Sequence, residues 1–330
     1  MAFENRQLFD DIAKSALKNY GWENDDETSL IVLSENATYL IKNKKTGAKD
    51  GVLRISRPGY HTLSELKSEM LWLNQINDYT PLIVANPIPG LDGEDIQVVK
   101  GSDGKDYFCV VTEFLEGHEP DENDETQMEK QFSYLGETTA YLHRQTEIWN
   151  GTNQIDRIHW DYDTIIGKNA AWGSWEDFPM SENEKELGRR ASDIIYHRLL
   201  RYGKTEDNYG LIHADLRLSN LLLEGDQIKV IDFDDCGFGW HLHDLASALS
   251  FIEDKPNVEY LVNAWLDGYR KVLPFSDTDF MEIDTFITMR RLQLTAWLAS
   301  HKDSDPVKEL SVGWMDGTDF LLERFIRMFG

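Results

Sequence analysis

The chain has 330 residues, an apolar content of 41% and a formal net charge of −26, so it is long enough for a globular protein of two lobes or domains. A charge of this sign would repel nucleic acid, and no uninterrupted apolar stretch is long enough to span a bilayer, so neither nucleic acid nor membrane is an expected partner. Two cysteines are too few for a disulfide framework, and the N-terminus lacks the pattern of a secretory signal, which together predict a cytoplasmic protein.

The first third of the chain has mostly β-type patterns. A helical pattern over residues 1–20 comes first, and three runs rich in β-branched and aliphatic residues follow between residues 28 and 57. A capping box, Thr62-Leu-Ser-Glu65, then opens one amphipathic helix, and a second hairpin is expected around Asp103-Gly104. These elements predict a small sheet-based lobe.

After Gly117 the pattern becomes helical. Residues 119–129 form an acidic loop in this prediction, and only one hairpin, at residues 220–232, interrupts the helices that follow. The helical patterns lie at about 131–146, 183–201, 243–253, 258–271, 279–300 and 317–328. Residues 1–110 carry a net charge of −5, so the remaining residues carry −21. This acidic second part would attract a cationic substrate, or it would only keep the protein in solution.

One segment combines several residue types at the spacing used for phosphoryl transfer. It reads Leu211-Ile-His-Ala-Asp-Leu-Arg-Leu-Ser-Asn220, and Val230-Ile-Asp-Phe-Asp234 follows it. The five-residue step from Asp215 to Asn220 is that of a kinase catalytic loop, in which the Asp receives the proton of the substrate hydroxyl and the Asn binds a metal. Asp232 occupies the place of a second, metal-binding Asp.

A hairpin at this segment would bring the two candidate metal ligands together. Two β-prone runs flank the turn signal Gly225-Asp226, and Asn220 and Asp232 each lie six positions from Asp226. Residues that face each other across antiparallel strands have Cβ atoms about 5 Å apart. Two oxygen ligands at that separation suit Mg²⁺, which keeps water and phosphate oxygens as its other ligands. The alternative is a hairpin whose ends are polar by chance.

With these motifs, and with Asp244-Leu-Ala246 and Leu135–His143, the chain resembles the aminoglycoside phosphotransferase/choline kinase family. The resemblance implies an α+β, protein-kinase-like bilobal fold, with a small β-rich N-terminal lobe that contains one helix (residues 1–116) and a larger, mainly helical C-terminal lobe (residues 117–330). It implies that Asp215 is the catalytic base, that His213 braces the loop, and that Asn220 and Asp232 bind Mg²⁺. Many family members have Gly between the His and the Asp, where this chain has Ala214.

The nucleotide-binding residues are less clear in the sequence. A kinase holds the phosphates with a strand Lys that pairs with a helix Glu, and the residues in those places are Arg54 and Glu69. Arg54 could instead be a surface cation, with Arg57 or a nearby Lys at the phosphates, and Glu65 is the alternative carboxylate.

Two further segments are expected to contact the nucleotide. Ser34-Glu-Asn36-Ala-Thr38 stands where a phosphate-covering loop belongs, although it lacks the glycines of such a loop. Thr112–Gly117, with Glu113 and Leu115, resembles the connection between the lobes whose backbone would contact the adenine.

An aromatic and acidic insert precedes the catalytic loop, and the resemblance makes it the acceptor-selecting region. Trp160, Trp172 and Trp175 could bind an ammonium group through cation–π contacts and the charge of the insert's carboxylates, Asp161, Asp163, Glu176 and Asp177. Asp234 is a further candidate for the substrate site, and it could also help to bind magnesium. The alternative for the tryptophans is packing of the insert against the helical lobe, and the alternative for Asp234 is a solvated loop carboxylate.

These observations predict a Mg²⁺-dependent phosphotransferase. Its donor would be ATP or GTP, and its acceptor a hydroxyl on a small, amine-bearing molecule such as an aminoglycoside, an amino alcohol or a hydroxy amino acid. Two other hypotheses stay open at this point. They are a protein Ser/Thr kinase, which would need a longer activation segment after Asp232, and a nucleotide-binding pseudokinase.

Overall fold

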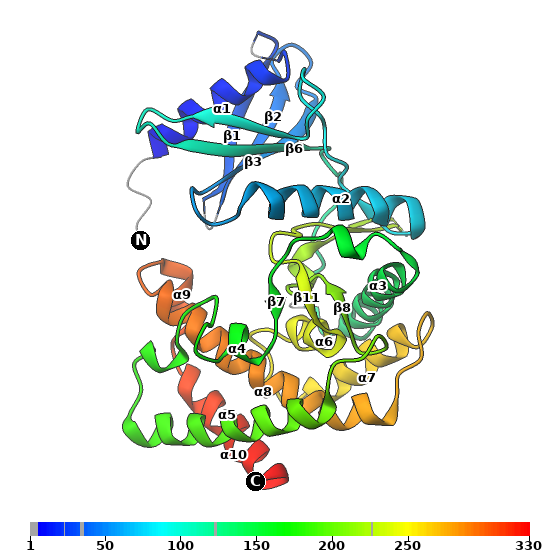
Figure 1. The fold of residues 1–330 in the computed structure, drawn as a ribbon, viewed down its shortest axis with the longest axis vertical. Helices are drawn as coiled ribbons and strands as arrows, with labels where there is room; N and C mark the ends of the chain where they lie inside the picture. The colour runs from blue at the N-terminus through cyan, green and yellow to red at the C-terminus, as the bar shows by residue number, and fades with distance from the viewer. Residues whose placement is uncertain (1–5, 23, 34–35, 122–123, 226) are drawn as a thin grey trace.

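The computed structural model describes residues 6–22, 24–33, 36–121, 124–225 and 227–330, and it has two lobes, one above the other in Figure 1. The strands are β1 (Asp26–Leu33), β2 (Asn36–Asn43), β3 (Lys49–Ser56), β4 (Ile83–Val84), β5 (Ile96–Lys100), β6 (Asp106–Thr112), β7 (His159–Trp160), β8 (Tyr209–Ile212), β9 (Leu221–Glu224), β10 (Gln227–Val230) and β11 (Gly237–Trp240). The helices are α1 (Arg6–Asn19), α2 (Leu63–Tyr79), α3 (Met128–Ile148), α4 (Tyr162–Ile165), α5 (Glu182–Tyr202), α6 (His241–Ala248), α7 (Val258–Tyr269), α8 (Asp277–Ser300), α9 (Asp305–Leu310) and α10 (Trp314–Phe329).

The small lobe is a five-stranded antiparallel sheet with a helix on each face. The strand order is β1-β2-β3-β6-β5. Successive side chains of a strand point to opposite faces, and in β6 Cys109 and Val111 pack with α1 whereas Val110 packs in the core that contains α2. The predicted capping box at Thr62 and Glu65 is present at the start of α2. The small lobe therefore has two helices, α1 and α2, and not the single helix that the resemblance implies.

The same alternation aims Arg54 at the site. Its neighbours in β3, Leu53 and Ile55, are fully buried against α1, so Arg54 projects from the opposite face of the sheet, toward α2. The strand pattern alone thus directs Arg54 to the side where the large lobe lies (Figure 1).

The large lobe is mainly helical, but it contains more β-structure than the sequence predicts. Besides the hairpin β9–β10, which β4 extends, a three-stranded sheet has the order β7-β11-β8. The prediction that the hairpin alone interrupts the helices is therefore wrong. Strands of two to four residues are too short to produce a readable alternation of apolar and polar positions.

Helices α3 and α7 cross so closely that both need a glycine at the crossing. A Cβ atom on Gly136 would lie 1.9 Å from the carbonyl oxygen of Trp265, and one on Gly268 would lie 1.9 Å from that of Ser133. Backbone-to-backbone contact of this kind excludes any side chain. The crossing fixes the position of α3, which lies next to the catalytic loop.

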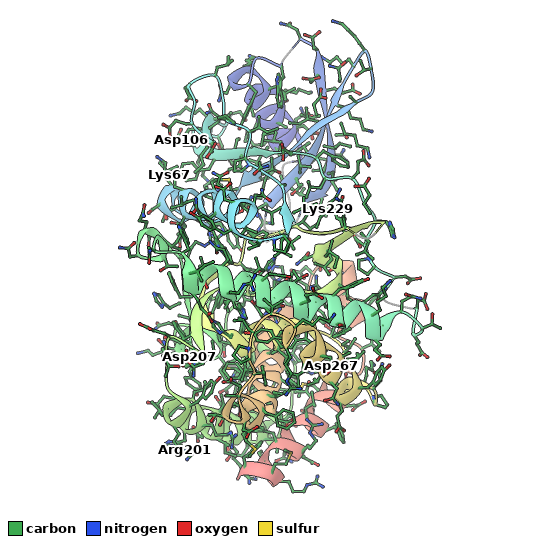
Figure 2. All side chains as sticks on the ribbon, turned by 90° about the vertical axis from the view of Figure 1, so that its right-hand side faces the viewer. Lys67, Asp106, Arg201, Asp207, Lys229 and Asp267 are labelled. Carbon is green, nitrogen blue, oxygen red and sulfur yellow. The ribbon has the colours of Figure 1, made fainter. Side chains whose placement is uncertain are left out.

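The lobes are joined by residues 113–117, after which His118 pairs with Leu223 of β9 through two backbone hydrogen bonds. The buried ammonium of Lys229, in β10, donates to the carbonyl of Glu116 at 2.7 Å, and Figure 2 places Lys229 at the junction of the lobes. The hairpin that carries the predicted metal ligands is thereby tied to the connection between the lobes. None of the helices within the described residues combines the length and apolar character needed to cross a membrane.

Candidate active site

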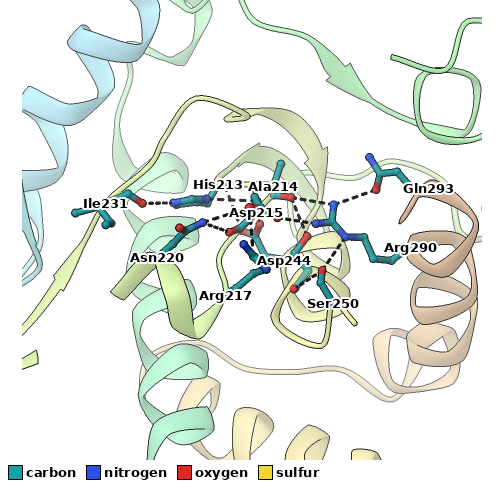
Figure 3. A network of polar contacts seen from close by, with 11 residues as sticks. His213, Ala214, Asp215, Arg217, Asn220, Ile231, Asp244, Ser250, Arg290 and Gln293 are labelled. Atoms are coloured by element: carbon teal, nitrogen blue, oxygen red, sulfur yellow. Dashed lines mark hydrogen bonds and ion pairs between the residues drawn. The ribbon is translucent and has the colours of Figure 1, made fainter. Parts of the chain in front are cut away.

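The catalytic loop begins where β8 ends, and a buried carboxylate holds its backbone. The Asp244 carboxylate accepts hydrogen bonds from the N–H groups of His213 (3.3 Å) and Ala214 (2.7 Å), and it also contacts Nε2 of His143 (Figure 3). Helix α6 begins at His241, so Asp244 lies in its first turn and does not cap it. Asp244 instead anchors the loop.

Ala214 has a left-handed backbone, with φ 69°. Side chains with a Cβ rarely adopt this conformation, which explains why Gly suits the position in the resembling family. The anchor at Asp244 and a hydrogen bond from Ser247 Oγ to the Ala214 carbonyl (2.8 Å) hold the strained residue in place.

His213 lies beneath the loop and is fully buried. Nε2 donates to the carbonyl of Ile231 (3.1 Å), Nδ1 accepts from the N–H of Asp215, and the ring packs on Phe233 at 4.6 Å between centroids. Burial lowers the pKa of His213, so the ring stays neutral. It joins the two motif segments and has no exposed atom for chemistry.

Asp215 is in contact with three side chains. Oδ1 is 2.6 Å from a guanidinium nitrogen of Arg290, and Oδ2 is 3.2 Å from Nδ2 of Asn220 and 3.5 Å from Nε of Arg217 (Figure 3). Asn220 also donates from Nδ2 to the Asp215 carbonyl at 2.8 Å. Both bonds are made by the amide nitrogen, so the amide oxygen of Asn220 is turned away from Asp215.

The hairpin brings Asn220 and Asp232 to the same end, with a register one residue away from the predicted one. Val230 pairs with Leu221, and Ile231 donates to the Asn220 carbonyl, so Ile231 and not Asp232 lies opposite Asn220. Asp226, in the predicted turn, is outside the described residues. Asp232 follows with φ 64° and lines the same cavity as Asp215.

The pKa of Asp232 is raised to about 7. Its carboxylate opens on the cavity, but the protein around it displaces bulk water, and the negative charges of Asp234 and Asp215 lie nearby. Within the described residues, no group of three or more His, Cys, Asp and Glu side chains could hold a metal ion by itself. A cation between Asp232 and the Asn220 oxygen would therefore need further oxygen ligands from a phosphate or from water.

Arg54 and Glu69 form the predicted pair, 2.6 Å apart; Glu69 is buried, and the Arg54 side chain is 17% exposed. A second nitrogen of Arg54 lies 3.4 Å from Asp234, which also contacts His61 (3.2 Å) and accepts from Nδ2 of Asn36 (2.9 Å). Burial alone would raise the pKa of Asp234, but Arg54 and His61 hold it below its usual value.

These contacts differ from the predicted roles of Asp234 and Asn36. Asp234 was expected at the acceptor, yet its carboxylate is enclosed by small-lobe groups. Asn36 lines the cavity, but its amide nitrogen is used by Asp234. Of the other polar residues of the predicted phosphate loop, Thr38 also lines the cavity, and Ser34 and Glu35 are outside the described residues.

Of the three predicted tryptophans, only Trp172 lines the cavity. Trp160 and Trp175 are 3% and 5% exposed and belong to the core, and Trp160 donates to the Asp235 carbonyl at 2.8 Å. Trp160 and Trp175 therefore follow the alternative, in which the tryptophans pack the insert against the helical lobe. Apolar surface of this size is more stable in the core than beside a polar cavity.

A single cavity of about 1170 Å³ lies between the lobes and connects these groups. Val52 of β3 and Leu222 and Ile231 of the hairpin line it from opposite sides, next to Glu113 and Leu115. The Glu113 carboxylate accepts from Asn86, and the Glu113 N–H donates to the Asn86 carbonyl. Within the described residues, the Glu113 carbonyl and the Leu115 N–H form no hydrogen bond.

The charged cavity residues that were not among the predicted site residues include Asp235 and Arg290. Asp235 follows Asp234 and was indistinguishable from a loop carboxylate. Arg290 lies in the buried part of α8, where a cation needs a partner. That requirement is the only signal the sequence offers for it.

Fold and site together define a phosphotransferase with a protein-kinase-like fold. Residues 32–275 match the model of the phosphotransferase enzyme family, and the chain belongs to this family. A microcompartment-associated aminopropanol kinase of known structure is 35% identical over 97% of this chain and 98% of its own, with a TM-score of 0.88.

Two other relatives are amicoumacin kinases. One, from Bacillus subtilis (strain 168), is 25% identical over 90% of this chain and 87% of its own length. The other, whose structure contains AMP-PNP, Ca²⁺ and Ami, is 20% identical over 98% and 94% of the two chains, with a TM-score of 0.76. The chain is therefore an enzyme, a small-molecule kinase that transfers a phosphoryl group to an alcohol. The hypotheses of a protein kinase and of a pseudokinase are not supported.

Proposed function

We propose that the enzyme transfers the γ-phosphoryl group of ATP or GTP to the hydroxyl group of a small amino alcohol. The acceptor oxygen forms a bond to the γ-phosphorus, the bond from that phosphorus to the β–γ bridging oxygen breaks, and the hydroxyl proton passes to Asp215. The products are the nucleoside diphosphate and the phosphate monoester of the amino alcohol. The observation that carries this proposal is that Asp215 and Asp232 line the cavity between the lobes, and that Asn220 lies in hydrogen-bond contact with Asp215.

Asn220 and Asp232 fit a divalent metal ion. The amide oxygen of Asn220 is directed away from Asp215 by the two bonds of its nitrogen, and the Asp232 carboxylate opens on the cavity. Hard oxygen donors of this kind suit Mg²⁺, which when bound supplies positive charge to the phosphates. The raised pKa of Asp232 describes the site without a cation, and a bound cation would favour the ionised carboxylate.

The nucleotide would lie against the hairpin with its base next to residues 113–115. Val52, Leu222 and Ile231 offer apolar surface for both faces of a purine. The Glu113 carbonyl and the Leu115 N–H would accept from and donate to its edge. Arg54, held by Glu69, would contact the phosphates, the role that a Lys has in related sites.

The acceptor amine would bind at Asp235. This carboxylate is half-buried on the cavity wall, and within the described residues no side chain donates a hydrogen bond to it. Burial, together with the charges of Asp215 and Asp234, raises the pKa of Asp235 well above its usual value, so a bound ammonium would stabilise its charged form. The 35% identity to a protein described as an aminopropanol kinase supports an amino alcohol over a larger acceptor such as an aminoglycoside.

The test is a panel of acceptors with Mg²⁺ and either ATP or GTP. Amino alcohols such as 1-amino-2-propanol and ethanolamine are compared with 2-propanol, which lacks the amine, and with propylamine, which lacks the hydroxyl. Acceptor-dependent release of the nucleoside diphosphate and detection of the phosphate monoester by ³¹P NMR measure the reaction. We expect product only when both groups are present.

Asp215→Asn provides the matched variant. Loss of the proton-accepting carboxylate should lower kcat by about 10²–10⁴-fold and leave the nucleotide Kd unchanged. Full activity of this variant, or a wild-type enzyme that phosphorylates none of the amino alcohols, would refute the proposal.

A further inference from the structure

Arg290 connects the helix α8 to the catalytic loop, and it lies outside the residues 32–275 that match the family model. Its side chain is 1% exposed, and one guanidinium nitrogen is 2.6 Å from Oδ1 of Asp215. Figure 3 shows it reaching Asp215 from the side opposite Asn220. The contact joins two segments that are 75 positions apart in the chain.

The other groups of this guanidinium are also occupied. Nε donates to Ser250 Oγ at 3.0 Å, the second terminal nitrogen donates to Gln293 Oε1 at 3.1 Å, and the guanidinium lies over the ring of Trp172, 5.0 Å from its centroid. A planar fork with this many partners has one orientation. Because Trp172 lines the cavity, the same cation fixes both the loop carboxylate and a part of the acceptor wall.

Stability alone does not account for a cation at this place. Burial lowers the pKa of Arg290, and the charges of Asp215 and Asp235 offset this only in part, while Arg217 adds a like charge. A buried ion pair is often no more stable than apolar residues of the same volume. A buried cation that contacts both Asp215 and the acceptor wall therefore suggests a role in the reaction.

We propose that Arg290 is a positioning residue, which holds Oδ1 of Asp215 so that Oδ2 faces the acceptor hydroxyl. This inference rests on the proposed function, in which Asp215 receives the hydroxyl proton. The two contacts of Oδ2 are longer, 3.2 and 3.5 Å, so this oxygen is the more available acceptor. Its distance to the hydroxyl depends on Arg290, and so does the place of the Trp172 ring beside the substrate.

The next residue, Arg291, is a matched control. It is 2% exposed, pairs with Glu253 at 3.1 Å, and lies over the ring of Trp314 at 3.3 Å. Burial lowers the pKa of both arginines. Arg291 therefore shares the burial, the carboxylate partner and the aromatic contact of Arg290, but its partners lie away from the cavity and outside the site described above.

The experiment compares Arg290→Met, Arg290→Lys and Arg291→Met in the full-length enzyme. For Arg290→Met we expect kcat to fall by about a hundredfold, as for a misplacement of about 1 Å, with the nucleotide Kd changed by less than about twofold. Arg290→Lys keeps the charge and should recover part of the loss, to about tenfold below wild type. Arg291→Met, which loses a similar buried pair, should keep kcat within about twofold. Equal losses for Arg290→Met and Arg291→Met, or wild-type kcat in Arg290→Met, would overturn the proposal.

A double-mutant cycle tests whether Arg290 acts through Asp215. The variant with both Asp215→Asn and Arg290→Met should be no slower than Asp215→Asn alone, because the carboxylate that Arg290 holds is already lost. Losses that multiply would show that Arg290 acts elsewhere and would overturn the inference. The cycle can be measured with any acceptor that the wild-type enzyme phosphorylates. If only alcohols without an amine are substrates, the acceptor proposal fails and the cycle still tests Arg290; full activity of Asp215→Asn overturns both.

Discussion

An arginine lies on each side of the cavity, the half-buried Arg54 on the side proposed for the nucleotide and the buried Arg290 on the side proposed for the acceptor, and the two are stabilised differently. Arg54 lies between two carboxylates, Glu69 at 2.6 Å and Asp234 at 3.4 Å. Arg290 has one close carboxylate, Asp215, and three uncharged partners. Burial disfavours both charges, but for Arg54 the carboxylates more than compensate, and its pKa is above the usual value, whereas that of Arg290 is below it.

The difference between the surroundings of the two arginines indicates which ligand charge each side of the cavity can bind. On the nucleotide side, Glu69, Asp232 and Asp234 lie around Arg54. Arg157 and His61 lie near Asp234, but the raised pKa of Asp232 indicates that its negative charge is disfavoured there without a bound cation. A triphosphate would need a divalent cation to enter such a place. On the acceptor side, Asp215 and Asp235 face Arg290 and Arg217, and the raised pKa of Asp235 disfavours its negative charge until a cationic group is bound. Removal of Arg54 should therefore affect folding and nucleotide binding, and removal of Arg290 should affect the transfer step.

Arg54→Met should give the largest effect on stability. It leaves Glu69 and Asp234 buried beside each other without their cation, which costs about 3–5 kcal/mol of the free energy of unfolding. The KM for the nucleotide should rise at the same time. Chemical denaturation and nucleotide titration measure the two effects, and Arg54→Lys is the control that keeps the charge. Unchanged nucleotide affinity in Arg54→Met would remove Arg54 from the phosphate site and favour the alternative, Arg57.

His243→Phe tests the acceptor side through the pH dependence of the free energy of unfolding. His243 is fully buried, stacks on Trp160 and lies near the charge of Arg290, and burial and that charge hold its pKa well below 6.5. Its neutral form therefore adds stability above pH 6.5, and this is lost as the pH falls, because the unfolded chain takes up the proton. Between pH 7.5 and pH 5 the wild type should lose about 2 kcal/mol more than His243→Phe. Denaturation curves at the two pH values measure this difference in stability loss. Equal losses in the wild type and in His243→Phe would contradict the lowered pKa of His243.

Ala214→Gly, in the loop between the two sides, should have the smallest effect. Glycine removes the left-handed strain at φ 69°, but it also increases the freedom of the unfolded chain, so a net stabilisation of about 0.5–1 kcal/mol is expected. The kcat should stay within about twofold of wild type, since Asp244 still holds the loop. A loss of stability, measured by denaturation, would show that Ala214 is not strained.

The catalytic loop and the Arg54–Glu69 pair were predictable because their signals are local. His213, Asp215, Asn220 and Asp232 lie within twenty positions, and the strand alternation directs Arg54 to Glu69. The register of the hairpin was wrong by one residue. The strands pair Glu224 with Gln227, so the centre of symmetry falls between Gly225 and Asp226 and not on Asp226.

The acceptor side was poorly predictable because it is assembled from distant segments. Nothing in the sequence shows that Trp172 lines the cavity while Trp160 and Trp175 are buried, since this depends on how the insert packs against α8. The contact of Arg290 with Asp215 depends on the same packing. A short sequence motif cannot contain both residues of this contact, because they are far apart in the chain.

The central claim is that Asp215, Asn220 and Asp232 converge on the transferred phosphoryl group, and a crystal structure with Mg²⁺ and AMP-PNP tests it most directly. We predict a Mg²⁺ ion about 2.1 Å from the Asn220 amide oxygen and from an Asp232 oxygen, with the γ-phosphate facing Oδ2 of Asp215. A metal ion bound to other side chains, or a γ-phosphate on the far side of the cavity from Asp215, would contradict the account.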